Sequence, residues 1–167
     1  PLVYFVRGTL PSLQDILLSH NYQLVEEILN WPCNELFLGE PFSENDIEHY
    51  NSQVKVNEFS ALASLVALGG ELTILRDVVR VVAQNGFVIT RPPGHHTTSS
   101  ELNGFCVFGH TATMAKYATK ILGLQRVLIF DWDIHYGNGT SEITKDDPSI
   151  VVINIQSSET YPFLSDQ

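Results

Sequence analysis

Residues 131–135 read D-W-D-I-H, which places two carboxylates and an imidazole at alternate positions. Alternate residues of an extended chain point to the same side, so Asp131, Asp133 and His135 share one face. The apolar run 127–130 precedes them and predicts a buried strand that ends here. An oxygen and a nitrogen donor two positions apart can converge on one divalent metal, for which Zn²⁺ is the better match and Fe²⁺ the less distinctive one. Taken alone, the same spacing also fits a capped loop with a hydrogen-bonded histidine.

A second polar cluster lies upstream, where residues 91–96 read R-P-P-G-H-H after a short apolar run. The imidazoles of His95 and His96 can accept a proton from a water and return one to a departing amine. A histidine in that role usually has its far nitrogen held by a carboxylate or an amide, and Asp131 and Asn138 are the candidates. A histidine pair alone is more often structural, but two polar clusters at strand ends predict one metal-dependent hydrolytic site.

The elements that must position these clusters follow from the hydrophobic spacing. Helices are predicted over 11–30 (in two parts), 58–83 and 104–122, and strands over 87–90, 126–131 and 150–155. Strands that alternate with helices of this length indicate βαβ units and a parallel sheet. The predicted fold class is therefore α/β, an open parallel sheet flanked by helices. Sites in such sheets form beyond the carboxyl ends of the strands, where both clusters lie.

The bulk composition limits the class of protein. The chain has 167 residues, 44% hydrophobic and 17% charged, which is typical of one soluble globular domain. No apolar run approaches the roughly 20 residues of a membrane span, and no signal segment is recognised, so we expect no membrane partner. The net charge of −10 argues against direct nucleic-acid binding and suits basic partners, although acidity also serves solubility alone. Two cysteines give no disulfide framework, so a reducing compartment is expected.

Three motifs together resemble a known family. Residues 91–96, 103–108 (N-G-F-C-V-F) and 131–140 (D-W-D-I-H-Y-G-N-G-T) are similar, in order and spacing, to the zinc-dependent histone deacetylases, closest to their class II branch. The resemblance implies an arginase/deacetylase-like fold. It also implies that residues 1–167 are the amino-terminal part of the catalytic domain, apparently truncated, with a motif-bearing core at about 58–156. The family's third zinc ligand and its oxyanion-stabilising residue would lie downstream of Gln167.

The resemblance further implies a role for each residue of the two clusters. Asp133 and His135 would bind zinc. His96 would be the general base on the attacking water, with His95 beside it as the charged or acid partner. Asp131 would orient His95. Asp131 would also hold a potassium ion, together with backbone carbonyls of the two zinc ligands.

The remaining implied roles concern orientation and the substrate. Asn138 would orient the general base. Gly104 and Phe105 would line the narrow channel that admits the acetyl-lysine side chain. Asn154 and Ile155 fall near the remaining ligands of the potassium ion.

Several residues are not assigned by this reasoning. Tyr161 and Asp166 lie too early in the chain to replace the family's downstream residues. His20, His49 and His110 are expected in the core or on the surface rather than as ligands. Residues 31–57 are expected to form surface loops where partners or substrates bind.

The predicted function is zinc-dependent hydrolysis of N6-acetyl-lysine in histones or other proteins, which releases acetate and would serve chromatin regulation and transcription repression. The partners implied are acetylated histone tails or other acetyl-lysine proteins, and corepressor proteins. The resemblance implies localisation in the nucleus and/or cytoplasm. Two alternatives stay open: a small-amide amidohydrolase of the acetylpolyamine type, and a catalytically inactive deacetylase-like scaffold.

Overall fold

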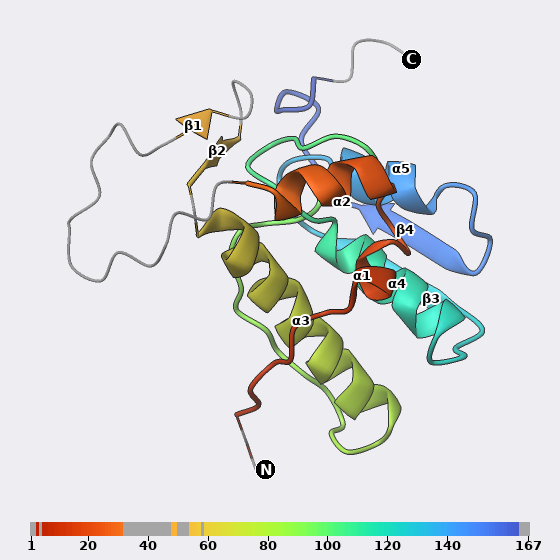
Figure 1. The fold of residues 1–167 in the computed structure, drawn as a ribbon. Helices are drawn as coiled ribbons and strands as arrows, with labels where there is room; N and C mark the ends of the chain where they lie inside the picture. Colours follow the sequence, from red (N-terminus) through yellow and green to blue (C-terminus); the bar gives the residue numbers. More distant parts are fainter. Residues whose placement is uncertain (1–2, 4, 32–47, 50–53, 58, 164–167) are drawn as a thin grey trace.

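The computed structural model describes residues 3, 5–31, 48–49, 54–57 and 59–163. In chain order the elements are α1 (Leu13–Ile16), α2 (Tyr22–Leu29), β1 (Glu48–His49), β2 (Lys55–Val56), α3 (Ser60–Val79), α4 (His110–Lys120), β3 (Val127–Asp131), α5 (Asn138–Thr144) and β4 (Ile150–Asn154). Figure 1 shows the long helix α3 beside α1 and α4, with β3, β4 and α5 on the far side of α4. The loops expected over 31–57 lie mostly outside the described residues.

The first two helices begin at side-chain caps. Ser12 accepts a hydrogen bond from the Asp15 backbone N–H, and the Asp15 carboxylate accepts one from Ser12, which is a capping box. Asn21 caps α2 by accepting from the backbone N–H of Leu24. The predicted pair of short helices over 11–30 is therefore confirmed, with the break just before Asn21.

Helix α3 packs closely against the chain that precedes α1. A Cβ at Gly69 would overlap the backbone carbonyl of Thr9, so only glycine allows this approach. This accounts for a glycine in mid-helix, where it costs stability. The predicted end of this helix near residue 83 is wrong, because the helix stops at Val79 and Val81 has a φ of 61°.

Helix α4 begins later than the sequence predicted. Gly104 and Phe105, the second and third residues of the N-G-F-C-V-F motif, have φ values of 51° and 66°. They therefore form a turn and not the first turn of a helix. Three alanines at helical spacing in α4 are all buried: Ala112, Ala115 and Ala118.

Strands β3 and β4 are parallel and in register from the pair Val127–Ile150 to the pair Asp131–Asn154, with α5 in the crossover between them. This confirms the predicted parallel sheet. The strand predicted over 87–90 is wrong, because these residues are in no strand and Phe87 is 87% exposed. Their apolar character alone does not make a strand, which also needs a hydrogen-bonded neighbour.

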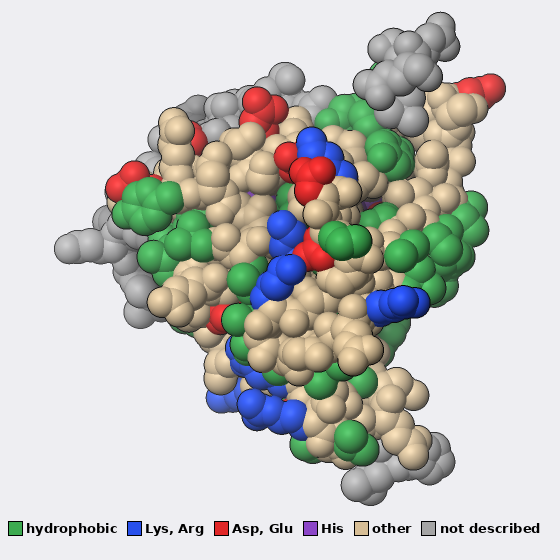
Figure 2. Space-filling model, turned by 90° about the vertical axis from the view of Figure 1, so that its right-hand side faces the viewer, with side chains coloured by type: hydrophobic (Ala, Val, Ile, Leu, Met, Phe, Trp, Pro, Cys, Tyr) green, Lys and Arg blue, Asp and Glu red, His purple; other side chains and the backbone are tan. Residues whose placement is uncertain are grey.

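The main core lies among α1, α2, α3 and α4, and a smaller cluster of Ala115, Ile129 and Ile150 lies under the sheet. The other face of the sheet is open to solvent. Its alternate residues are 43–61% exposed: Leu128, Phe130, Val151 and Ile153. Trp132 and Ile155, the residues that directly follow the two strands, are exposed as well. Figure 2 shows apolar side chains gathered along one flank of the molecule. Among the described residues, no helix is long and apolar enough to cross a membrane.

Candidate active site

His95 is held by the carboxylate at the end of β3. Its Nδ1–H donates to Asp131 Oδ2 at 2.9 Å, and both side chains are about one-sixth exposed. Burial acts to raise the pKa of Asp131, but the hydrogen bonds from His95 and from the Asp133 backbone outweigh it and hold that pKa below its ordinary value. Asp131 is therefore ionised at neutral pH. Its charge fixes Nδ1 as the protonated nitrogen of His95 and leaves Nε2 available to a substrate.

His96 is held in the same way by an amide. Its Nδ1 lies 2.8 Å from Asn138 Oδ1, and the residue is only 4% exposed. A carbonyl oxygen can only accept, so Nδ1 carries the proton and Nε2 carries the lone pair. Burial lowers the pKa of His96, against the opposing effect of the Asn138 hydrogen bond. The ring is thus neutral near pH 7, which is the state a general base requires.

Asp133 and His135 lie at the mouth of the site. Asp133 Oδ1 is 2.8 Å from His135 Nδ1 and accepts a second hydrogen bond, also 2.8 Å, from the His135 backbone. Burial acts to raise the pKa of Asp133, but these two hydrogen bonds lower it overall. The two side chains are 48% and 42% exposed, so both can reach a ligand.

An oxygen and an imidazole nitrogen at this separation suit two ligands of one zinc ion. A catalytic zinc site takes a third protein ligand as well. Within the described residues, no group of three or more His, Cys, Asp or Glu side chains is placed to hold a metal. Asp133 and His135 therefore fit zinc as a partial donor set.

Two glycines allow the clusters to approach each other. A Cβ at Gly137 would lie 2.6 Å from Asp131 Oδ2, against the carboxylate that holds His95. A Cβ at Gly139 would overlap the backbone carbonyl of Thr97. Any larger residue at either place would push α5 away from the histidine pair.

The histidine pair and the two candidate zinc ligands open onto one cavity of about 290 Å³. It is lined by Pro93, His95, His96, Gly104, Phe105, Asp133, His135 and Tyr161. Gly104 and Phe105 are among these lining residues, and their role in a substrate channel stays a prediction. The sequence did not assign Tyr161, whose ring meets His96 edge-on with centroids 4.9 Å apart. No local motif marks it, because it lies beyond β4 and reaches the site only through the fold.

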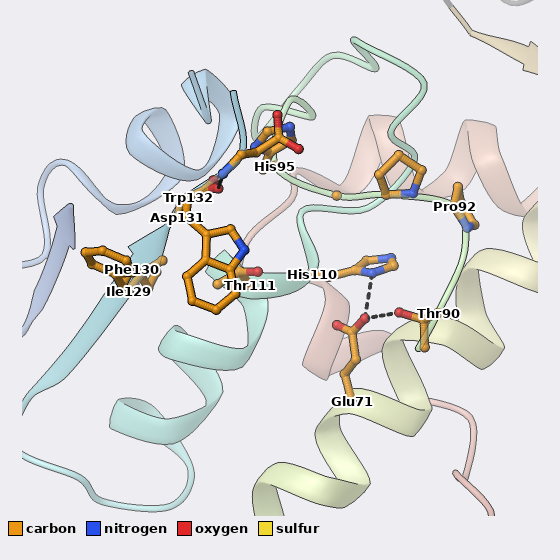
Figure 3. A pocket seen from close by; sticks show the side chains of 13 residues that line it. Glu71, Thr90, Pro92, His95, His110, Thr111, Ile129, Phe130, Asp131 and Trp132 are labelled. Atoms are coloured by element: carbon orange, nitrogen blue, oxygen red, sulfur yellow. Dashed lines mark hydrogen bonds and ion pairs between the residues drawn. The ribbon is translucent and has the colours of Figure 1, made fainter. Parts of the chain in front are cut away.

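A second cavity of about 340 Å³ lies behind His95 and Asp131 (Figure 3). On one wall the Glu71 carboxylate accepts hydrogen bonds from His110 Nδ1 at 3.0 Å and from the Thr90 hydroxyl at 2.5 Å. The sequence predicted His110 either in the core or on the surface, and the structure places it in the core. Its pairing with Glu71 was not predicted. The two residues are 39 positions apart and share no pattern.

Comparison with known proteins places these residues in a wider context. The sequence profile described as "Histone deacetylase domain" matches residues 6–167. The chain is 35% identical over 150 residues to the polyamine deacetylase HDAC10 of Danio rerio, a match that covers 90% of this chain and 22% of that protein. It is 33% identical over 144 residues to histone deacetylase 6 of Caenorhabditis elegans, covering 85% of this chain and 15% of that protein.

Among solved structures, the crystal structure of the HDA15 HD domain matches with a TM-score of 0.81 and 28% identity. The match covers 94% of this chain and 42% of that chain. The α/β fold predicted from the sequence is thus the fold of that domain. The chain spans less than a quarter of the two curated relatives described above.

Proposed function

The chain belongs to the histone deacetylase family, and we propose that it contributes the histidine pair and two zinc ligands to an amide hydrolase that removes acetyl groups from N6-acetyl-lysine. One observation carries the proposal. The rings of His95 and His96 lie side by side, 4.0 Å between centroids, and each is held through Nδ1 with Nε2 left for chemistry. We propose residues 1–167 as part of the catalytic domain, with its core at about 58–156.

Asp133 and His135 would hold the zinc ion. A zinc ion bound there supplies Lewis-acid polarisation of the acetyl carbonyl and makes the attacking water more acidic. The low pKa of Asp133 supports this role, because a carboxylate must be ionised to bind a metal.

The protein's own groups move the protons. His96, kept neutral by its burial, accepts a proton at Nε2 from the attacking water. His95, whose Nδ1–H donates to the Asp131 carboxylate, would be the acid partner that delivers a proton to the departing lysine nitrogen. The different holders of the two rings, a carboxylate and a neutral amide, support this division of roles.

The apolar walls of the cavity favour a linear acetylated amine as the substrate. Phe105 is 71% exposed and, with Tyr161, offers an apolar wall beside His96. Such walls suit the methylene chain of a lysine, while the acetamide reaches the histidine pair. The same walls suit an acetylated polyamine, and the resemblance to a polyamine deacetylase keeps that substrate as the second candidate.

The test is acetate release, with one equivalent of zinc, by the protein extended to include the third zinc ligand expected downstream of Gln167, from an acetyl-lysine peptide and from an acetylated polyamine. We expect hydrolysis of the peptide, lost by at least about 100-fold in His96→Ala because the general base is gone. Zinc binding is measured by mass spectrometry of the native protein. It should be retained in His96→Ala and lost in Asp133→Ala. Ser100→Ala, an exposed residue of the same region, is the matched control and should keep both properties.

Two outcomes contradict the proposal. Faster turnover of the acetylated polyamine than of the peptide would replace the lysine substrate by the polyamine. Stoichiometric zinc without hydrolysis of either compound would favour the inactive scaffold.

A further inference from the structure

The segment that follows the histidine pair, residues 97–101, is here called the brace loop. Ser99 in this loop donates two hydrogen bonds to the Glu142 carboxylate: its backbone N–H to Oε2 at 2.9 Å and its hydroxyl to Oε1 at 3.1 Å. A carboxylate that binds both donors of one residue fixes that residue in position and orientation. Neither Ser99 nor Glu142 touches the cavity around His96.

Glu142 belongs to the same helix as the residue that holds His96. Asn138 and Glu142 are four positions apart in α5, so their side chains emerge on the same side, one turn apart. Asn138 binds His96, and Glu142 binds Ser99, three residues further along the chain. Helix α5 is therefore joined to the segment of residues 96–99 by two side-chain contacts. One, between Asn138 and His96, orients a ring that lines the cavity, and the other, between Glu142 and Ser99, lies outside it.

Backbone contacts between these ties leave little freedom. The Thr140 backbone N–H donates to the carbonyl of His95 at 3.1 Å. Gly139 lies directly against the backbone of Thr97, which is fully buried. A change in the position of the brace loop would therefore move the whole segment against α5.

The opposite side of the brace loop is fixed by His20. Its Nδ1 lies 3.0 Å from the Thr98 carbonyl, and its Nε2 accepts the Gly109 backbone N–H at 2.9 Å. A carbonyl needs a donor and an N–H needs an acceptor, so only the neutral Nδ1–H form satisfies both. The next residue, Asn21, donates its backbone N–H to the Ser99 carbonyl at 2.8 Å. The loop is thus held from the α1–α2 junction on one side and from α5 on the other.

We propose that Glu142 is a positioning residue that, against the support of His20, holds His96 in hydrogen-bonding distance of Asn138. The chemical consequence is the tautomer of His96. While Asn138 accepts from Nδ1, the lone pair stays on Nε2, where a base must present it. When the tie to Ser99 is lost, the His96 ring moves relative to Asn138 and both neutral tautomers become populated. The inference rests on the proposed function for its catalytic consequence but not for its structural one.

The direct test reads the tautomer in this chain, without substrate. The ring nitrogens of ¹⁵N-histidine-labelled protein at pH 7.5 should show His96 in the Nδ1–H form. Glu142→Ala should convert this signal to a mixture of the two tautomers. Glu142→Gln retains one acceptor oxygen for Ser99 and should restore most of the Nδ1–H form. Glu101→Ala removes an exposed carboxylate of the brace loop itself and is the matched control, with the spectrum of the unmodified protein.

The catalytic readout separates positioning from substrate binding. In protein that hydrolyses an acetyl-lysine peptide, Glu142→Ala should lower kcat about 10-fold and leave KM within about 2-fold. Glu142→Gln should recover most of the loss. A purely structural role of Glu142 would lower the amount of folded protein without changing kcat per folded molecule or the tautomer signal.

The outcomes are decisive in either direction. A His96 signal that stays in the Nδ1–H form in both Glu142 variants overturns the proposal, whether or not the protein is active. A tautomer mixture in Glu142→Ala that Glu142→Gln reverses supports it, even if no acetylated compound is hydrolysed and the proposed function fails. If Glu142→Ala does not fold, Ser99→Ala takes its place, because it removes the hydroxyl that donates to Glu142 Oε1: a mixture of tautomers supports the proposal and an unchanged Nδ1–H signal overturns it.

Discussion

Lowering the pH from 7 to 5 should destabilise the fold by about 2 kcal/mol through one side chain, that of His20. This residue is 3% exposed, and burial lowers its pKa from the ordinary 6.5 to about 4, although its hydrogen bond to Thr98 acts in the opposite direction. In the unfolded chain the imidazole returns to its ordinary pKa and binds a proton below about pH 6.5, whereas the folded ring stays neutral down to about pH 4. The stabilisation by neutral His20 is therefore complete above pH 6.5 and is lost as the pH falls.

The loss grows to about 3 kcal/mol at pH 4, since each unit of pKa difference is worth about 1.4 kcal/mol. Protonation would also put an N–H at Nε2 against the Gly109 N–H that it now accepts. The assay is urea unfolding at pH 7, 6, 5 and 4, for the unmodified chain and for His20→Gln, which cannot titrate. His20→Gln should be less stable at pH 7 by about 1–3 kcal/mol, because a buried donor or acceptor is left unmatched.

The difference between the two proteins should then shrink by about 2 kcal/mol between pH 7 and pH 5. Ser100→Ala, at an exposed residue that does not titrate, is the control, and its curve should run parallel to that of the unmodified chain. Metal is removed with a chelator throughout. Parallel pH dependence of His20→Gln and the unmodified chain would refute the reasoning, because the buried neutral histidine would then not be what acid destabilises.

Three further predictions concern packing and reactivity. Gly139→Ala should cost about 1–3 kcal/mol in urea unfolding, since its Cβ would overlap the Thr97 backbone, which cannot turn aside as a side chain can; a cost well below about 1 kcal/mol would contradict this. Cys106 is buried, which raises the pKa of its thiol to about 11, so it should resist alkylation by iodoacetamide at pH 8 until urea unfolds the chain. Leu68→Ala, at a fully buried position, should cost about 2–5 kcal/mol in chemical unfolding, whereas Leu128→Ala, at a side chain 61% exposed, should cost less than about 1 kcal/mol.

The open face of the β3–β4 sheet shows that an apolar residue in a strand need not be buried. Parallel strands are usually buried on both faces and therefore read as continuous apolar runs. The runs 127–130 and 150–153 fit this pattern, and both became strands. In the described structure, however, Phe130 and Val151 are half exposed. A pattern reports that a side chain is apolar, and only the packing of other elements determines whether it is covered.

Local rules determined much of the rest. The polar end of β3 was predicted, because it depends on the spacing of residues within one element. The strand predicted over 87–90 was wrong because a strand needs a hydrogen-bonded neighbour, and the local sequence does not show whether one is present.

The contacts of the site depend on residues far apart in the sequence. His95 meets Asp131 across 36 positions and His96 meets Asn138 across 42. Residue types and family resemblance predicted these two pairings, whereas hydrophobic periodicity carries no information about them. The chemical roles that follow from them, and the zinc ion, stay predictions.

The sequence by itself determined which residue types could do chemistry and that two polar clusters would follow apolar runs, because strand and helix periods fix which side chains share a face. The tertiary structure alone decided the tie from His20 to Thr98, 78 positions away, and the Ser99–Glu142 tie, 43 positions apart. It also decided that Tyr161 lies against His96. The physical reason is that a hydrogen bond between distant segments forms only where the packing of whole helices and strands brings donor and acceptor within about 3 Å.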